Sequence, residues 1–205
     1  MTQPVPRKPA AAKKPVRRFS WLRLPAPKRL EPAVQQLQDE SHARLGYVRN
    51  FLKLPFGPGR LALYQGYLDR LMRSPDGHLP PLERELLALV TSVENRCEVC
   101  ILSHAAALKK HGMDRHRVDA MALAWRRAEL SPRHHALAEF ASKLTLHPAD
   151  VDATLMGGLR AAGLGEAEIF EAIQVVAIYN SNNRLNNALG MQPNDEARPG
   201  FQPER

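Results

Sequence analysis

The sequence predicts an all-α fold, a bundle of seven or eight helices, from three observations. Apolar residues recur at the three- and four-residue spacing of amphipathic helices over most of the chain after about residue 30. No stretch of alternating β-branched residues, which would indicate a strand, interrupts this pattern. Proline and glycine stand where helices start and stop, as at Pro32 and Gly46. A chain of 205 residues is long enough to bury a core, so we expect one helical domain.

The starts and stops of these helices can be justified one by one. Pro81 and Pro132 suit a first helical turn, where the missing N–H is not needed, and Ser131 is a favourable N-cap. Gly163 and Gly190 end the last two helices. The expected ranges are 32–45, 59–72, 81–93, 96–111, 114–127, 131–146, 149–161 and 165–189.

The helix expected at residues 96–111 carries the most informative residues. Asn95 is a plausible N-cap for it, and Glu98, three residues on, would complete a capping box. Gly112 supplies the stop.

The domain is expected to occupy residues 19–192. Residues 1–18, rich in Pro, Ala, Lys and Arg, cannot bury enough apolar surface to order themselves and predict a disordered basic tail. Phe19, Trp21 and Leu22 are the first large apolar residues after this tail and are expected to pack on the body. Residues 193–205 form a polar C-terminal tail.

The positive charge of the chain is confined to its beginning. The formal net charge is +8, but residues 1–29 contain nine Lys and Arg and no Asp or Glu, so the remainder is close to neutral. A basic tail attracts anionic surfaces weakly. The distribution does not indicate specific nucleic-acid binding by the folded body.

The cysteine content indicates a reducing compartment. Cys97 and Cys100 are the two cysteines, too few for a secreted disulfide framework. No apolar segment of a signal peptide follows the basic start, and no apolar stretch is long enough to span a membrane. We therefore expect a cytoplasmic protein with a redox-active or metal-binding CxxC.

Four residues form a candidate redox site. Cys97, Cys100 and His104 are spaced three and four apart on one helix, so their side chains share a face. A helix N-terminus lowers the pKa of a thiol, and His104 can accept the Cys100 proton. Glu85, on the preceding helix, can orient His104 if the two helices pack antiparallel. The arrangement favours a reactive thiolate, with the second cysteine closing a disulfide.

Other interpretations of the CxxC are weaker. A c-type haem site needs His directly after the second Cys, where this chain has Ile101, and a thioredoxin site needs a βαβ unit. Structural zinc takes four ligands, for which Glu85 would be a poor fourth. A zinc-stabilised helical module remains a possible alternative on spacing alone.

The motif Glu-x11-Cys-x2-Cys-x3-His resembles the active-site signature of the alkyl hydroperoxidase D-like (AhpD-like) group within the carboxymuconolactone decarboxylase superfamily. Further segments are similar to its peroxidase-related branch, whose "LGfvpN" segment resembles residues 45–50. The other similar segments are residues 83–90, 140–145 and 180–190. The resemblance covers roughly residues 19–192.

The resemblance implies an all-α fold with the site on a helical hairpin, and a homo-oligomer that is a dimer, trimer or hexamer. It makes Cys100 the peroxide-attacking thiol, Cys97 the resolving thiol, and His104 with Glu85 the proton relay. The position at the helix start would by itself favour Cys97 as the attacking thiol. The implied partners are a hydroperoxide substrate and a dithiol reductant, such as a lipoyl-bearing protein, with no metal and no cofactor.

The leading hypothesis is thus a thiol peroxidase or disulfide reductase that removes alkyl hydroperoxides in an antioxidant role. The alternatives are a redox-sensing or stress-associated module of the same fold without turnover, and a carboxymuconolactone decarboxylase-type enzyme that works without the cysteines.

Polar residues elsewhere are expected to be structural. Asn180, Asn183, Arg184 and Asn187 form one stripe of the last helix, and we interpret it as a helix–helix or subunit contact rather than a pocket wall. Glu94 lies close to Cys97 and is expected to face water, because its charge would otherwise raise a thiol pKa.

Overall fold

Eight α-helices and four short 3-10 turns make up the folded part of the chain. The computed structural model describes residues 19–22, 29–55, 57 and 59–198, so the predicted tail at residues 1–18 lies outside the described residues. These ranges contain no strand, and the all-α prediction is confirmed. The helices are α1 (Pro32–Leu45), α2 (Arg60–Arg73), α3 (Pro81–Glu94), α4 (Glu98–Lys110), α5 (Arg115–Ala124), α6 (Pro132–Leu146), α7 (Ala153–Ala161) and α8 (Glu166–Ala188).

Local sequence signals fix most of the helix starts. Pro32, Pro81 and Pro132 each stand in the first turn of their helices. Ser131 and Asp152 cap α6 and α7 by accepting hydrogen bonds from backbone N–H groups two or three positions into the helix.

The α1 helix ends where its sequence predicts. Gly46 adopts a left-handed conformation with φ +80°, which glycine reaches without the strain that a Cβ would cause. Its N–H bonds to the His42 carbonyl and closes the helix.

The centre of the fold is α3. It packs against α4, α5, α6 and α8, and its residues 86–90 are completely buried. A run of five apolar residues places apolar side chains on every side of a helix, which explains why this part of α3 lies inside the other helices. The rest of the core comes from residues of the helices around it, including Trp125, Phe140 and Val176.

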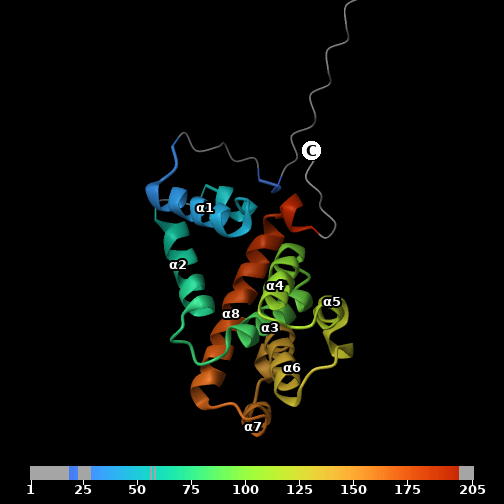
Figure 1. The fold of residues 1–205 in the computed structure, drawn as a ribbon. Helices are drawn as coiled ribbons and strands as arrows, with labels where there is room; N and C mark the ends of the chain where they lie inside the picture. The colour runs from blue at the N-terminus through green and yellow to red at the C-terminus, as the bar shows by residue number, and fades with distance from the viewer. Residues whose placement is uncertain (1–18, 23–28, 56, 58, 199–205) are drawn as a thin grey trace, which may run out of the picture.

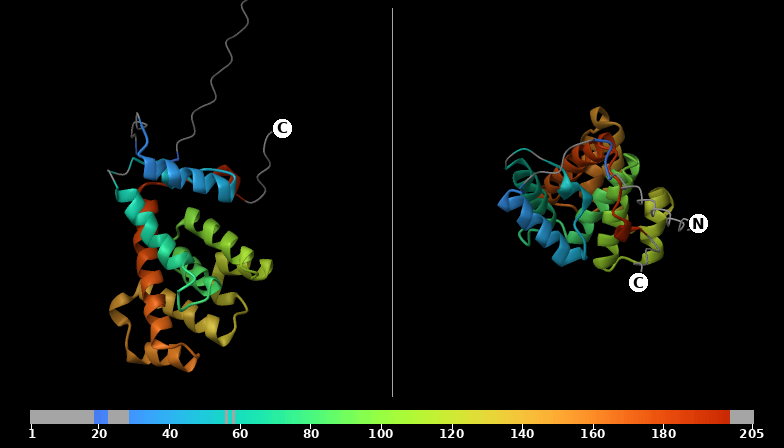
Figure 2. Two further views of the ribbon diagram at one scale, coloured as in Figure 1. Left: turned by 60° about the vertical axis from the view of Figure 1, so that its left-hand side comes forward. Right: turned by 90° about the horizontal axis from the view of Figure 1, so that it is seen from above.

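The 23-residue helix α8 runs the length of the molecule beside α3 and α4 (Figure 1). The α1 helix lies across the C-terminal end of α8, and α7 lies at the opposite end (Figure 2, left). The α2 helix leads from α1 down the side of α8, with which it makes contact. The molecule therefore has a helical core and an outer α1–α2 layer.

One buried ion pair ties α3 to α8. Arg84 Nε donates to Glu171 Oε1 at 2.5 Å, and both side chains are almost fully buried. The loop at Gly77 passes so close that a Cβ there would overlap the Arg84 guanidinium. Glu171 also accepts the backbone N–H of His78, so the loop before α3 is held as well.

The two ends of the described chain are joined by backbone hydrogen bonds. The N–H of Trp21 donates to the Leu189 carbonyl, and the N–H of Gln192 donates to the Phe19 carbonyl, both at 2.9 Å. The ring of Trp21 lies against Gly190, where a Cβ would overlap it. Trp21 nevertheless remains 71% exposed, so the expected packing of this segment is only partial.

A search for membrane-spanning segments over the described ranges finds no helix of sufficient length and apolar character to cross a bilayer.

Candidate active site

The α3–α4 hairpin brings the four predicted site residues to one region of the core. Glu85 comes from α3, whereas Cys100 and His104 come from α4. Cys97 is the N-cap of α4, in an extended conformation, and its N–H donates to the Ser92 carbonyl at 3.0 Å.

The predicted start of this helix is wrong by two residues. The sequence placed Cys97 in the first turn with Asn95 as the cap, but Asn95 is the C-cap of α3. Between them Arg96 adopts a left-handed backbone with φ 53°, which breaks the helix. It is the one non-glycine residue with positive φ in the described ranges, and such strain is typical of a functional turn.

The two sulfurs lie next to one another. Cys97 Sγ and Cys100 Sγ are 2.7 Å apart and share a hydrogen bond, and both are free thiols. Exposure is 0% for Cys97 and 5% for Cys100, so little of either sulfur reaches solvent. A small movement brings the atoms to the roughly 2.05 Å of a disulfide bond.

The shared hydrogen bond shifts the pKa values of the two thiols in opposite directions. The hydrogen bond with Cys100 lowers the pKa of Cys97, more than burial raises it. The same hydrogen bond, together with burial, raises the pKa of Cys100. The pair therefore loses one proton readily and holds the second, and the first negative charge resides mainly on Cys97.

A second pair joins His104 to Glu85. His104 Nδ1 lies 2.7 Å from Glu85 Oε2, as the antiparallel hairpin predicted. Both side chains are largely buried. This contact leaves Nε2 as the ring nitrogen that can exchange a proton with another group.

Three residues that the sequence interpretation did not assign complete the surroundings of Cys100. Asn186 Nδ2 donates to Cys100 Sγ at 3.5 Å. Tyr179 meets the His104 ring edge-on, with centroids 4.4 Å apart, and burial and the Glu85 and Cys100 charges raise its pKa. Burial and the Cys100 charge raise the pKa of Tyr64 to about 12. The Tyr64 hydroxyl is buried without a hydrogen-bond partner.

The stripe of asparagines on α8 makes the helix–helix contact expected of it. Asn180 accepts a hydrogen bond from the Asn95 side chain, and Asn183 accepts one from Ser92. Asn187 donates to the Asn95 carbonyl. These bonds attach α8 to the turn before Cys97. Asn186 lies three residues after Asn183, so the same helical spacing was the signal that could have identified it.

The expectation that Glu94 faces water is wrong. Its carboxylate is largely buried and accepts hydrogen bonds from Trp125 Nε1 at 2.8 Å and Ser142 Oγ at 2.7 Å. Burial would raise the pKa of Glu94, but these hydrogen bonds and the charge of Arg126 lower it. Glu94 thus joins α3 to α6.

No group of three or more His, Cys, Asp and Glu side chains in the described ranges is arranged to hold a metal ion.

Comparison with protein families agrees with this geometry. The model of the carboxymuconolactone decarboxylase family matches residues 58–143, which include all four predicted site residues. An uncharacterised peroxidase-related protein from Silicibacter sp. TM1040 is 28% identical, with a TM-score of 0.83 over 91% of this chain and 97% of that one. The family match and the similarity to this structure support the resemblance of the chain to the AhpD-like group of the carboxymuconolactone decarboxylase superfamily.

Other solved structures are also similar to this chain. An uncharacterised peroxidase-related protein with an alkylhydroperoxidase AhpD core, from Ralstonia eutropha JMP134, is 29% identical, with a TM-score of 0.81 over 88% of this chain and 95% of that one. The debrominase Bmp8 in complex with 2,3,4-tribromopyrrole is 19% identical, with a TM-score of 0.70 over 87% of this chain and 95% of that one. At that identity the likeness to Bmp8 concerns the fold. Among curated proteins, none matches this chain.

Proposed function

We propose that the protein is a thiol-dependent peroxidase that reduces alkyl hydroperoxides through Cys97 and Cys100. The observation that carries the proposal is the pair of free thiols 2.7 Å apart on the same hairpin as a hydrogen-bonded Glu85–His104 pair. The relatives described as peroxidase-related support the class of reaction.

The cycle begins with a thiolate. It attacks the terminal peroxide oxygen, so that an S–O bond forms and the O–O bond breaks. The alkoxide leaves as an alcohol after taking a proton, which His104 can supply from Nε2 while Glu85 holds Nδ1. The sulfur is oxidised by two electrons to a sulfenic acid.

The second thiol completes the oxidation. It attacks the sulfenic sulfur, water leaves, and the Cys97–Cys100 disulfide forms. An external dithiol, such as a dihydrolipoyl group, returns two electrons and two protons and restores both thiols. No metal or organic cofactor enters these steps.

We assign the attack to Cys100, although the lowered pKa of Cys97 places more of the resting charge there. Cys100 Sγ accepts a hydrogen bond from the Asn186 amide, and His104 lies one helical turn further along α4. One proton moving across the 2.7 Å hydrogen bond transfers the thiolate from Cys97 to Cys100.

The first test counts thiols before and after one equivalent of cumene hydroperoxide. Mass spectrometry of the peptide containing both cysteines should show rapid loss of two thiols and of two hydrogens in mass. Thiols that remain reduced under these conditions would contradict the proposed reaction. Metal analysis of protein purified without chelator tests the zinc interpretation separately, since that interpretation requires one zinc per chain.

The burial of both sulfurs favours one second candidate, a redox-sensing module that oxidises without turning over. Thiols with 0% and 5% exposure limit the entry of peroxide and reductant. Excess peroxide with excess dihydrolipoamide distinguishes the two functions, because an enzyme consumes many equivalents of peroxide per chain and a sensor consumes one.

A further inference from the structure

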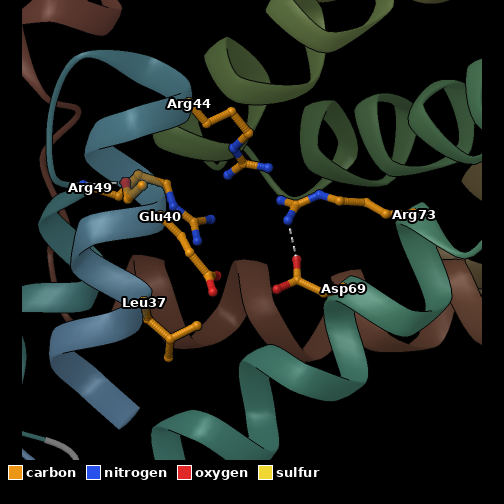
Figure 3. Close-up of a pocket in the computed structure, with 7 residues that line it drawn as sticks. Leu37, Glu40, Arg44, Arg49, Asp69 and Arg73 are labelled. Carbon is orange, nitrogen blue, oxygen red and sulfur yellow. Dashed lines mark hydrogen bonds and ion pairs between the residues drawn. The ribbon is translucent and has the colours of Figure 1, made fainter. Parts of the chain in front are cut away.

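A cavity lined with arginines lies between α1 and α2. Its volume is about 140 Å³. Figure 3 shows the Arg44 and Arg73 guanidinium groups facing one another across it, with Arg49 and Glu40 on the α1 side. The lining residues are Leu37, Glu40, Ser41, Arg44, Arg49, Asp69 and Arg73.

The positive charge of this lining is only partly neutralised. Arg73 forms an ion pair with Asp69, and Glu40 accepts a hydrogen bond from Gln36. Within the described part of the chain, neither Arg44 nor Arg49 forms an ion pair, and Arg49 Nε is buried without a hydrogen-bond partner.

The positive charges of the arginines that line the cavity repel one another. Burial and the neighbouring arginine charges lower the pKa of both Arg44 and Arg49. A guanidinium stays charged even so, because its ordinary pKa lies far above neutrality. Three arginines against two carboxylates leave one positive charge, which a singly charged anion would neutralise.

The α2 helix, which carries Asp69 and Arg73 of the cavity, packs against α3 and α8, the helices that carry Glu85 and Asn186 of the candidate active site. The charge of Glu85, the partner of His104, acts on Arg44. Tyr179 on α8 meets the His104 ring edge-on, and its pKa is raised by burial and by the Glu85 and Cys100 charges, whereas the Arg73 and Arg49 charges lower it. An anion in the cavity would thus be a neighbour of the residues around the dithiol.

We propose that the cavity between Arg44, Arg49 and Arg73 binds the carboxylate of an organic hydroperoxide, whose peroxide group then reaches Cys97 and Cys100. This inference rests on the peroxidase function proposed above and names its substrate class. Arginine forks match the geometry of a carboxylate and bind it in two parallel hydrogen bonds. A cavity of about 150 Å³ is large enough for a benzene ring, so the space accommodates a carboxylate with part of its carbon skeleton.

The test compares two peroxides with the same carbon skeleton around the peroxide, the anionic cumene hydroperoxide carrying a para-carboxylate and its neutral methyl ester. Stopped-flow measurement of dithiol oxidation at low salt should give a rate constant about tenfold higher for the acid. Equal rate constants for the two peroxides would overturn the inference and leave the peroxidase function standing.

Two variants test whether the preference for the acid over the ester depends on the cavity. Arg44 is an exposed helical residue, so Arg44→Gln should fold, and it should reduce the acid-to-ester ratio toward parity. The matched control is Arg70→Gln on α2, whose side chain is 81% exposed and lies outside the cavity lining. An unchanged ratio in Arg44→Gln, or an equal loss in Arg70→Gln, would count against the cavity.

A binding measurement separates this inference from the chemistry. The probe is para-isopropylbenzoate, which has the carboxylate and no peroxide, titrated calorimetrically into the wild-type protein and both variants. Saturable binding that Arg44→Gln weakens about tenfold supports the site even if no peroxide is reduced. Absence of saturable binding to the wild-type protein contradicts it.

Discussion

The helical core and the α1–α2 layer hold charge in opposite ways. In the core, Arg84 and Glu171 are buried and paired, and Glu85 is bonded to His104. In the layer, Arg44 and Arg49 face a cavity without an ion-pair partner among the described residues. Paired charges fix a structure, whereas unpaired charges beside a cavity are available to a ligand. The proposed chemistry thus resides in the rigid part and the proposed recognition in the outer part.

The sharpest test of the core is removal of either sulfur. Cys97→Ser and Cys100→Ser should each lower turnover by several orders of magnitude, because the disulfide cannot form. Cys97→Ser should in addition leave a sulfenic acid on Cys100, detectable by dimedone labelling and mass spectrometry. Full activity in Cys100→Ser would contradict the mechanism, and a dimedone adduct confined to Cys97 in that variant would reverse the two roles.

The next largest effect should be a difference between the two regions in the stability lost when one partner of an ion pair is removed. Arg84→Met leaves Glu171 buried without its partner and should lower the free energy of unfolding by about 3–5 kcal/mol. Asp69→Asn in the layer removes a partly exposed pair with Arg73 and should cost less than about 1 kcal/mol. Urea denaturation of both variants measures the difference. Similar losses of unfolding free energy in the two variants would show that buried pairing in the core stabilises the fold no more than the partly exposed pair in the layer.

Glu85 should matter for reactivity more than for folding. Glu85→Gln removes the charge that orients His104, and we expect peroxide reduction to slow roughly a hundredfold, with little change in melting temperature. Glu85→Asp should recover part of the rate, and the pH profile of thiol alkylation should shift in Glu85→Gln alone. Glu139→Gln, an exposed change on α6, is the control. A wild-type pH profile in Glu85→Gln would exclude the relay.

The smallest expected effect concerns acid stability. Burial alone would raise the pKa of Glu83, but hydrogen bonds from His134 and Arg133 outweigh it and lower the value to about 2. A depressed native pKa stabilises the fold above the ordinary value of 4.5, and that stability is lost as pH falls from 4.5 toward 2. The lost contribution should be on the order of 2 kcal/mol.

Denaturation at several acidic pH values tests this assignment. Glu83→Gln should flatten the decline in stability between pH 4.5 and 2, whereas Glu139→Gln on the exposed side of α6 should leave it unchanged. The same slope in the wild-type protein and Glu83→Gln would assign the acid sensitivity to another group.

Local signals were sufficient to predict the helices and the four-residue motif. Pro32 and Pro132 mark helix starts through backbone chemistry that neighbours do not alter, and the spacing of Cys100 and His104 fixes a shared helical face. The start of α4 was misplaced because Arg96, unlike glycine, gives no sign of a left-handed backbone.

Contacts between distant segments explain what the sequence did not reveal. Asn186 reaches Cys100 from α8, and the arginine-lined cavity joins α1, the segment after it and α2. Glu94 was expected in water because of its closeness to Cys97 in the sequence, and its partners Trp125 and Ser142, far along the chain, could not be foreseen. Such groupings depend on how helices pack, which no local pattern specifies.

The hydrogen bonds between residues 19–21 and 189–192 have a consequence for engineering. These bonds place residues 19–21 beside residues 189–192, so the segment between them begins and ends at the same place in the fold. A short peptide joining the ends, with a new opening in the loop between α6 and α7, would rearrange the order of the helices along the chain and preserve their packing. The α3–α4 hairpin would then stand in the middle of the permuted chain, with its thiols unmoved.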